Sequence, residues 1–239
     1  MTGRIDVHSH LLPGVDDGCK TVEESIACAK VLVENGYTHA FCTPHIWQKY
    51  AGISRSSVPL MCAQLQKELD AAKVPLKLLP GGELNIFLGV DKTPADEIVP
   101  LGLGKYMLVD IWAATLPPFF EEAVQWLHAM GLEVVLAHPE RMRAVQDEPD
   151  LVDYFQSLGI YLQGNLQCFA DEPDAHTRKC AEKFLLDGKY FLLGSDTHSP
   201  ESIDGRMKGL QRVNELIGFA ETFVLTRDNP QKLLPEAFL

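Results

Sequence analysis

Short apolar runs alternate along the chain with longer segments of helical periodicity. The runs are about five residues long and nearly all apolar, which is typical of strands buried on both faces of a parallel sheet. They lie at Ile5–Val7, Thr38–Thr43, Lys77–Pro80, Tyr106–Val109, Glu133–Ala137, Ile160–Gln163 and Tyr190–Leu193.

The intervening segments place apolar residues three and four positions apart, as amphipathic helices do. The first begins at a capping box, in which Thr21 is the N-cap and Glu24 the third helical residue. Four further helices are predicted within 58–72, 120–130, 151–158 and 180–187. Four of the five helices end at a glycine that directly precedes an apolar run, and glycine accepts the left-handed backbone that closes a helix. These glycines are Gly36, Gly131, Gly159 and Gly188.

This repeat of strand and helix predicts an α/β fold, with a parallel sheet or barrel of about seven strands. The chain has 239 residues, enough for a sizeable core, and no linker or low-complexity tract divides it. We therefore expect a single domain over residues 1–239. The Pro- and Gly-rich stretch from Gly81 to Gly104 is expected to be a loop excursion.

Composition and charge exclude several classes of function. The net charge of −12 argues against a nucleic-acid partner. No apolar run approaches the length of a membrane span, and the N-terminus carries no signal segment, so we expect a cytoplasmic protein without membrane insertion. The six cysteines form no C-x-x-C pair, and three of them, Cys28, Cys42 and Cys180, are expected to be small core residues in a reducing compartment. No cysteine is followed six residues later by arginine, so the phosphate loop of cysteine-dependent phosphatases is absent.

Histidines and carboxylates follow six of the seven apolar runs. In a parallel barrel these strand ends gather at one rim, where active sites are built. Each residue alone has a structural alternative, since Asp17 could cap a turn, Asp110 could cap a helix and His45 could lie in the core. Their coincidence at six strand ends favours a shared site. The candidates are His8, His10, Asp17, His45, Glu83, Asp110, His138, Asp196 and His198.

This mixture of nitrogen and oxygen ligands suits more than one Zn, Mn or Fe ion. Four carboxylates with three divalent ions would leave the site electropositive, so it would attract a phosphate dianion. Arg141 and Arg206 follow two of the ligand motifs and could bind phosphate bidentately, the alternative being solvated or helix-end arginines. The remaining histidines are expected to be structural or solvated: His39, His128 and His176.

Six motifs together resemble the PHP (polymerase and histidinol phosphatase) family, and most of all its bacterial protein-tyrosine-phosphatase branch, associated with capsule and exopolysaccharide biosynthesis. They are Asp6-Val7-His8-Ser9-His10, Pro13-Gly14-Val15-Asp16-Asp17-Gly18, Thr43-Pro44-His45, Gly82-Glu83, His138-Pro139-Glu140-Arg141 and Ser195-Asp196-Thr197-His198. The resemblance implies a distorted (β/α)7 TIM-like barrel of PHP type. It also implies two to three divalent ions, with Mn²⁺ expected first and Fe or Zn as alternatives.

The resemblance also implies how the ligands are shared. His8, His10, Glu83 and Asp196 would hold one ion, Asp17, His45 and His198 a second, and Glu83, Asp110 and His138 a third. Arg141 and Arg206 match the phosphate-orienting arginines of the family. The branch usually has glutamate where this chain has Asp110, which is one methylene shorter, so the third position departs from the pattern.

The function implied is that of a phosphomonoesterase in which a metal-activated hydroxide attacks a phosphotyrosyl protein, such as a bacterial tyrosine kinase of polysaccharide synthesis. Two alternatives stay open. The first is a small-metabolite phosphatase for histidinol phosphate or a sugar phosphate, and the second is a non-catalytic metal-binding regulatory domain. Trp47, soon after His45, is predicted either to stack on the phosphotyrosine ring or to be an exposed loop aromatic. The oligomeric state is not predicted.

Overall fold

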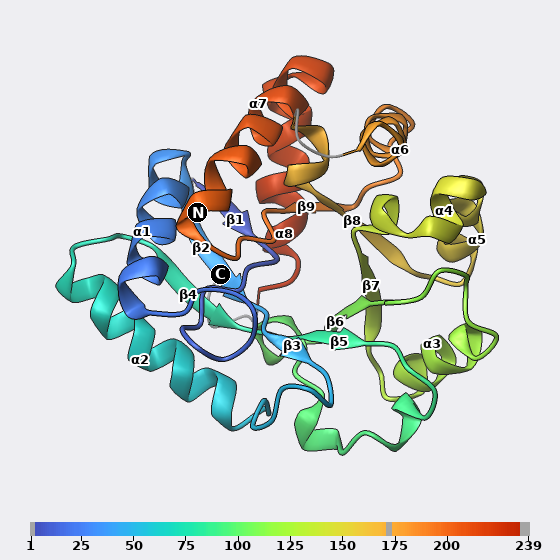
Figure 1. The fold of residues 1–239 in the computed structure, drawn as a ribbon, viewed down its shortest axis with the longest axis horizontal. Helices are drawn as coiled ribbons and strands as arrows, with labels where there is room; N and C mark the ends of the chain where they lie inside the picture. The colour runs from blue at the N-terminus through green and yellow to red at the C-terminus, as the bar shows by residue number, and fades with distance from the viewer. Residues whose placement is uncertain (1–2, 171–173, 235–239) are drawn as a thin grey trace.

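The strands of this protein form two parallel sheets in a computed structural model that describes residues 3–170 and 174–234 (Figure 1). The ends of the expected domain, and residues 171–173, lie outside the described residues. The smaller sheet has the order β1 (Arg4–Asp6), β2 (Tyr37–Cys42), β4 (Lys77–Pro80). The larger sheet has the order β3 (His45–Ile46), β5 (Glu83–Asn85), β6 (Tyr106–Asp110), β7 (Glu133–Ala137), β8 (Tyr161–Asn165), β9 (Leu192–Gly194).

The two sheets join into one closed ring. β2 continues into β3 after two residues that include Pro44, which lacks an N–H for a sheet ladder, and β4 continues into β5 after two glycines. At the other side, the chain after β9 pairs with the chain after β1: the Asp196 amide donates to the His8 carbonyl and the His10 amide to the Thr197 carbonyl, both at 2.8 Å. The predicted (β/α)7 barrel is therefore confirmed, since β2 with β3 and β4 with β5 each count as one bent strand. These two bends are the distortion that the prediction included.

Helices cover the outside of the ring (Figure 1). Five were predicted, namely α1 (Val22–Glu34), α2 (Ser57–Ala71), α3 (Phe120–Ala129), α5 (Leu151–Ser157) and α6 (Ala175–Leu186). The sequence analysis did not find α4 (Arg143–Asp147), the long α7 (Pro200–Phe223), the π-helical turn η6 (Val224–Asp228) or α8 (Asn229–Gln231). Three glycines interrupt the apolar stripe of α7, which hid its periodicity.

The expected loop excursion from Gly81 to Gly104 was wrong in part. Its first residues form the buried strand β5, and the rest contains the 3-10 turns η1 (Val90–Lys92), η2 (Ala95–Glu97) and η3 (Leu101–Leu103). A strand of three residues directly after two glycines has no periodicity by which a sequence could reveal it. Two more 3-10 turns follow later strands, η4 (Pro139–Arg141) and η5 (Leu166–Phe169).

The core has two apolar layers, which explains why the strands are apolar at every position. In β7, Val135 and Ala137 belong to the cluster inside the ring, whereas Val134 and Leu136 belong to the cluster between the ring and the helices. Alternate side chains along a barrel strand point to opposite sides, and here both sides are buried. The six cysteines are free and buried, including Cys28, Cys42 and Cys180, for which burial was predicted. Within the described residues, no helix combines the length and apolarity needed to cross a membrane.

The close approach of α7 to the ring generates a first prediction. A Cβ atom on Gly209 would lie 1.8 Å from the carbonyl oxygen of Leu166, in η5. Gly→Ala normally stabilises a helix by about 1 kcal/mol, but here the methyl would collide with backbone. We expect Gly209→Ala to lower the free energy of unfolding by about 3 kcal/mol or more, as measured by thermal or urea unfolding. The control is Lys208→Ala at the exposed neighbouring position, and equal losses in both variants would contradict the prediction.

Candidate metal centre

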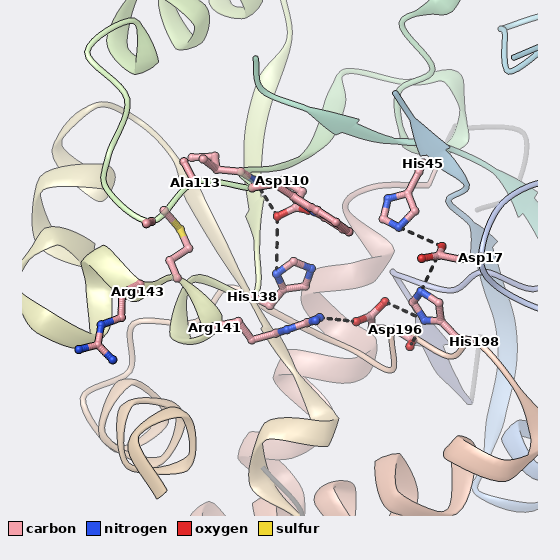
Figure 2. Close-up of a pocket in the computed structure, with 13 residues that line it drawn as sticks. Asp17, His45, Asp110, Ala113, His138, Arg141, Arg143, Asp196 and His198 are labelled. Carbon is pink, nitrogen blue, oxygen red and sulfur yellow. Dashed lines mark hydrogen bonds and ion pairs between the residues drawn. The ribbon is translucent and has the colours of Figure 1, made fainter. Parts of the chain in front are cut away.

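The predicted ligands converge at one end of the barrel. His8 and His10 follow β1, His45 begins β3, Glu83 begins β5, and Asp110 ends β6. His138 directly follows β7, and Asp196 and His198 follow β9. Most of them line a cavity of about 490 Å³, whose other walls come from Ile111–Ala114 and Arg141–Arg143 (Figure 2). The remaining three ligands, His8, His10 and Glu83, are buried beneath it.

The carboxylate of Glu83 lies in the middle of the cluster. Its Oε2 atom is 2.8 Å from Nδ1 of His45, 3.3 Å from Nε2 of His8 and 3.4 Å from Nε2 of His10. Its Oε1 atom is 3.2 Å from Nε2 of His138. Although it is so closely surrounded, the buried Oε2 has no hydrogen-bond partner of acceptable geometry. A buried, unpartnered carboxylate oxygen ringed by imidazole nitrogens is what a metal site without its ion presents.

Neighbouring residues set the tautomers of the two buried histidines after β1. Nδ1 of His8 lies 2.9 Å from Oε1 of Gln163, and Nδ1 of His10 lies 2.7 Å from Oδ2 of Asp16. Because both acceptors hold the N–H of a neutral ring at Nδ1, the lone pair is on Nε2 in each case. The two Nε2 atoms lie only 3.1 Å apart and point into the same space.

Three of the four donors predicted for the first ion lie close together. Oδ1 of Asp196 is 3.4 Å from Nε2 of His8 and 3.3 Å from Nε2 of His10, and these three residues offer ligand atoms within 4.8 Å of one another. Ligands placed tetrahedrally at about 2.0–2.1 Å from a metal lie about 3.3 Å from one another. The spacing of these two imidazoles and one carboxylate therefore fits a divalent cation, and Oε2 of Glu83 also lies 3.3 and 3.4 Å from the same two nitrogens.

The pKa shifts in the cluster also indicate that it needs positive charge. Burial opposes the charged form of His8, but the carboxylates of Glu83 and Asp196 outweigh burial and raise its pKa to about 9. Burial likewise opposes ionisation of Glu83 and Asp196, yet His8 and the other imidazoles hold the pKa of both carboxyls well below its usual range. The carboxylates thus stay ionised and require compensating cations, which protons or metal ions can supply.

A second group of donors lies nearer the surface. Oδ1 of Asp17 is 3.3 Å from Nε2 of His45 and 3.7 Å from Nε2 of His198. These three residues and His10 offer ligand atoms within 4.8 Å of one another. Burial, with a smaller contribution from His10, lowers the pKa of His198 to about 4, so this ring is neutral near pH 7 and able to bind metal.

The third group contains His8, Glu83 and His138, but not Asp110. Nδ1 of His138 is 3.9 Å from Oδ1 of Asp110, and that oxygen accepts a hydrogen bond from the Ile111 amide at 2.6 Å. The other carboxylate oxygen accepts the indole N–H of Trp112. The structure therefore brings Asp110 to the edge of the group, at the position where the chain departs from the family pattern.

Two ligand positions have strained backbones. His138 and Asp196 adopt positive φ values of 34° and 51°, a region that non-glycine residues rarely occupy. His138 directly follows β7, and Asp196 follows β9 after one residue, Ser195. Strain of this kind costs on the order of 1 kcal/mol per residue and is concentrated at functional sites.

The structure places the two predicted arginines differently. Arg141 lines the cavity, its side chain is 49% exposed, and its Nη1 donates to Oδ2 of Asp196 at 2.9 Å (Figure 2). Arg206 is buried and donates to the backbone carbonyls of Ser195, Asp196 and Ser202. It holds the loop that carries Asp196 from below and does not line the cavity, so its role in binding phosphate stays a prediction.

The sequence analysis missed residues that support the ligands. Asp16 accepts hydrogen bonds from His10, from the Gly18 amide and from the His45 amide, at 2.7 to 3.0 Å. Asn165 donates to Oδ2 of Asp196 at 2.7 Å. Asp16 stands in one of the family motifs, beside Asp17, but the sequence analysis gave it no role. Gln163 and Asn165 lie in a strand that ends in amides and gave no sign of a site.

The aromatic wall of the cavity also differs from expectation. Trp112, and not Trp47, lines the cavity with the ligands. Trp47 lies behind Trp112, with ring centroids 5.2 Å apart, and lines a neighbouring cavity with Tyr50. Which tryptophan faces the cavity depends on two loops from different strands, and a single sequence does not show how they meet.

Comparisons with known proteins agree with this geometry. The profile of the family described as "Capsular polysaccharide synthesis, CpsB/CapC" matches residues 4–235. The tyrosine-protein phosphatase YwqE of Bacillus subtilis is 31% identical over 200 residues, which cover 82% of this chain and 77% of that protein.

Solved structures support the fold. A chain from the structures of YwqE from Bacillus subtilis and CpsB from Streptococcus pneumoniae, described as metal-dependent tyrosine phosphatases, superposes with a TM-score of 0.88 and 26% identity, covering 96% of this chain and 94% of that one. The lactonase Lmo2620 from Listeria monocytogenes shares the fold at a TM-score of 0.60 and 11% identity, covering 98% and 95%.

The partners of Asp16 generate a second prediction. Asp16→Asn keeps the shape of the side chain but replaces one of its two acceptor oxygens with an NH₂ group. The single remaining oxygen cannot accept from both His10 and the Gly18 amide. Because a ligating histidine is oriented by the partner of its other nitrogen, we expect Mn²⁺ affinity to fall about 10- to 100-fold. Calorimetric titration of chelator-stripped protein measures this, with the exposed Asp187→Asn as control. Equal affinity in the Asp16 variant and the wild type would show that Asp16 does not orient His10.

Proposed function

This chain belongs to the CpsB/CapC family of capsular polysaccharide synthesis, and on that premise we propose that it is a metal-dependent phosphomonoesterase that hydrolyses phosphotyrosyl protein. The observation that carries the proposal is the Glu83 carboxylate, ringed by four imidazoles directly beneath an open cavity with an arginine at its wall. A bacterial tyrosine kinase of polysaccharide synthesis is the proposed class of substrate protein. The proposed unit is one domain over residues 1–239, since the ring closes between the first and last strands.

The proposed centre holds two to three divalent ions, with Mn²⁺ the first candidate. His8, His10, Glu83 and Asp196 would hold one ion, and Asp17, His45 and His198 a second. Glu83 and His138 would hold a third with Asp110 beside them. When bound, such ions lower the pKa of water and polarise phosphoryl oxygens. The absence of a thiolate among the candidate ligands, all of them nitrogen or oxygen donors, supports Mn²⁺ over softer metals.

The side chains of the cavity supply binding and orientation. Arg141 can offer its guanidinium to the equatorial oxygens of a phosphoryl group while one nitrogen stays bonded to Asp196. The aryl leaving group has a pKa near 10 and therefore needs little help from a general acid. This agrees with the cavity wall, in which the histidines and carboxylates are the proposed metal ligands. The nearby carboxylate of Glu140 lies outside the cavity, where it is buried and accepts a hydrogen bond from Tyr190.

The alternative of a small-metabolite phosphatase shares the same ligands. The cavity wall distinguishes the two candidate functions, because it contains the indole of Trp112, which is 62% exposed. An open cavity suits a ring carried on a protein segment better than a free small molecule, most of whose surface is usually buried in its pocket.

Metal dependence is the first test of the function. Chelator-stripped protein should be inactive toward p-nitrophenyl phosphate, and activity should return with Mn²⁺. His138→Ala should recover less than about 1% of it, because removing a ligand changes both charge and geometry of the centre. The exposed His176→Ala is the matched control.

The substrate is tested separately from the chemistry. Restored protein should have a higher kcat/KM for a phosphotyrosyl peptide than for histidinol phosphate. Restored wild type that binds Mn²⁺ but hydrolyses no phosphoester would overturn the proposal in favour of a binding domain. Asp110→Glu would then be the first change to make, since it restores the residue usual in the branch.

The two arginines generate a further prediction. Arg141→Lys keeps the charge but loses bidentate geometry, so kcat/KM should fall at least tenfold while the melting temperature changes little. Arg206→Lys should mainly lower stability, by about 1–3 kcal/mol, because buried carbonyls lose their donors. Kinetics and thermal unfolding of both variants check this division. A kinetic loss of similar size in Arg206→Lys, without loss of stability, would instead assign Arg206 to phosphate binding.

A further inference from the structure

We infer that Trp112 determines the substrate specificity of this site: its indole face receives the aryl group of the substrate, and its N–H holds Asp110 in place. The inference rests on the proposed function and names the residue that would select an aryl phosphate. Three observations carry it, namely the place of Trp112 in the cavity wall, its hydrogen bond to Asp110 and the rings packed against it.

The hydrogen bond to Asp110 restricts the orientation of the indole. The indole N–H lies in the ring plane, so its hydrogen bond to Oδ2 of Asp110 is made by the edge of the ring and does not cover either face. Trp112 is 62% exposed although its N–H is engaged. An aromatic ring held by its edge with exposed surface is a stacking platform that loses little side-chain entropy when a ligand binds.

Neighbouring rings brace Trp112. The ring of Trp47 lies at a centroid distance of 5.2 Å and an interplanar angle of 43°. The imidazole of His45 lies edge-on at 6.1 Å and 89°. Trp47 itself borders the neighbouring cavity, so it acts as a support and Trp112 as the surface that faces the substrate.

The wall of the cavity contains both kinds of group that an aryl phosphate needs. Arg141, Asp196 and His198 form a polar part, where a phosphoryl group would meet the proposed metal ligands, and Trp112 lines the same cavity beside Ile111 and Ala113. A phosphate bound at the polar part would place its ester group in the cavity that the indole lines. An alkyl phosphate would contact less of this wall than an aryl phosphate does.

The same indole also reaches the metal centre. Of the two oxygens of Asp110, Oδ2 is held by Trp112 and Oδ1 by the Ile111 amide, which leaves Oδ1 3.9 Å from Nδ1 of His138. Aspartate is shorter than glutamate, so its position depends on what anchors it. Trp112 is therefore a positioning residue for Asp110 as well as a wall of the cavity.

Binding of matched phosphonates tests the stacking. Benzylphosphonate and methylphosphonate differ only in the aryl group, and neither is hydrolysed, so calorimetry on Mn²⁺-loaded protein reports binding alone. We expect the wild type to prefer benzylphosphonate, Trp112→Ala to reduce that preference about tenfold, and Trp112→Phe to keep most of it. Trp47→Phe is the control. An unchanged preference in Trp112→Ala would overturn the aryl-binding role.

Metal titration tests the link to Asp110. Trp112→Phe keeps a ring but loses the N–H, so the weakest Mn²⁺-binding step should weaken about tenfold, while Trp47→Phe should titrate as the wild type does. Identical titrations of Trp112→Phe and wild type would overturn the positioning role. Both measurements are independent of turnover: a protein that showed these effects yet hydrolysed no phosphoester would refute the proposed function and leave the role of Trp112 standing.

Discussion

The burial of one carboxylate constrains the rest of this structure. Glu83 is 1% exposed and ionised, and a charge in that position is tolerated only if cations or donors surround it. Four imidazoles from three other segments of the ring approach its two oxygens. The strand ends of the ring must therefore meet in a fixed register when the ring closes. The strained backbones of His138 and Asp196 show where the fold gives up stability to meet this demand.

Much of this arrangement could be predicted from the sequence because the physical signals were local. Apolar runs punctuated by glycine identified the strands of the ring, and a histidine or carboxylate after nearly every run identified the rim. In the structure, Nε2 of His8 and Nε2 of His10 each lie within 3.4 Å of an oxygen of Glu83 and an oxygen of Asp196.

What the sequence could not predict depends on contacts between distant segments. The position of Arg206 under the Asp196 loop depends on α7, whose glycines hide its periodicity. The choice between Trp47 and Trp112 depends on how two loops meet. Asp16 and Gln163 orient ligands through single hydrogen bonds that no spacing rule announces. Residues that orient a metal ligand matter nearly as much for metal binding as the ligand itself. Their residue types and spacing in the sequence do not distinguish them from other polar residues.

The closure of the ring between Ser9 and Thr197 has a consequence for how the protein matures in the cell. During synthesis, His8 and His10 emerge from the ribosome long before Asp196 and His198 have been translated. Until then the half-made sheet has two open edges and its set of donor atoms is incomplete. The donors of the proposed metal centre therefore come together only after β9 and Thr197 have been made and the ring has closed.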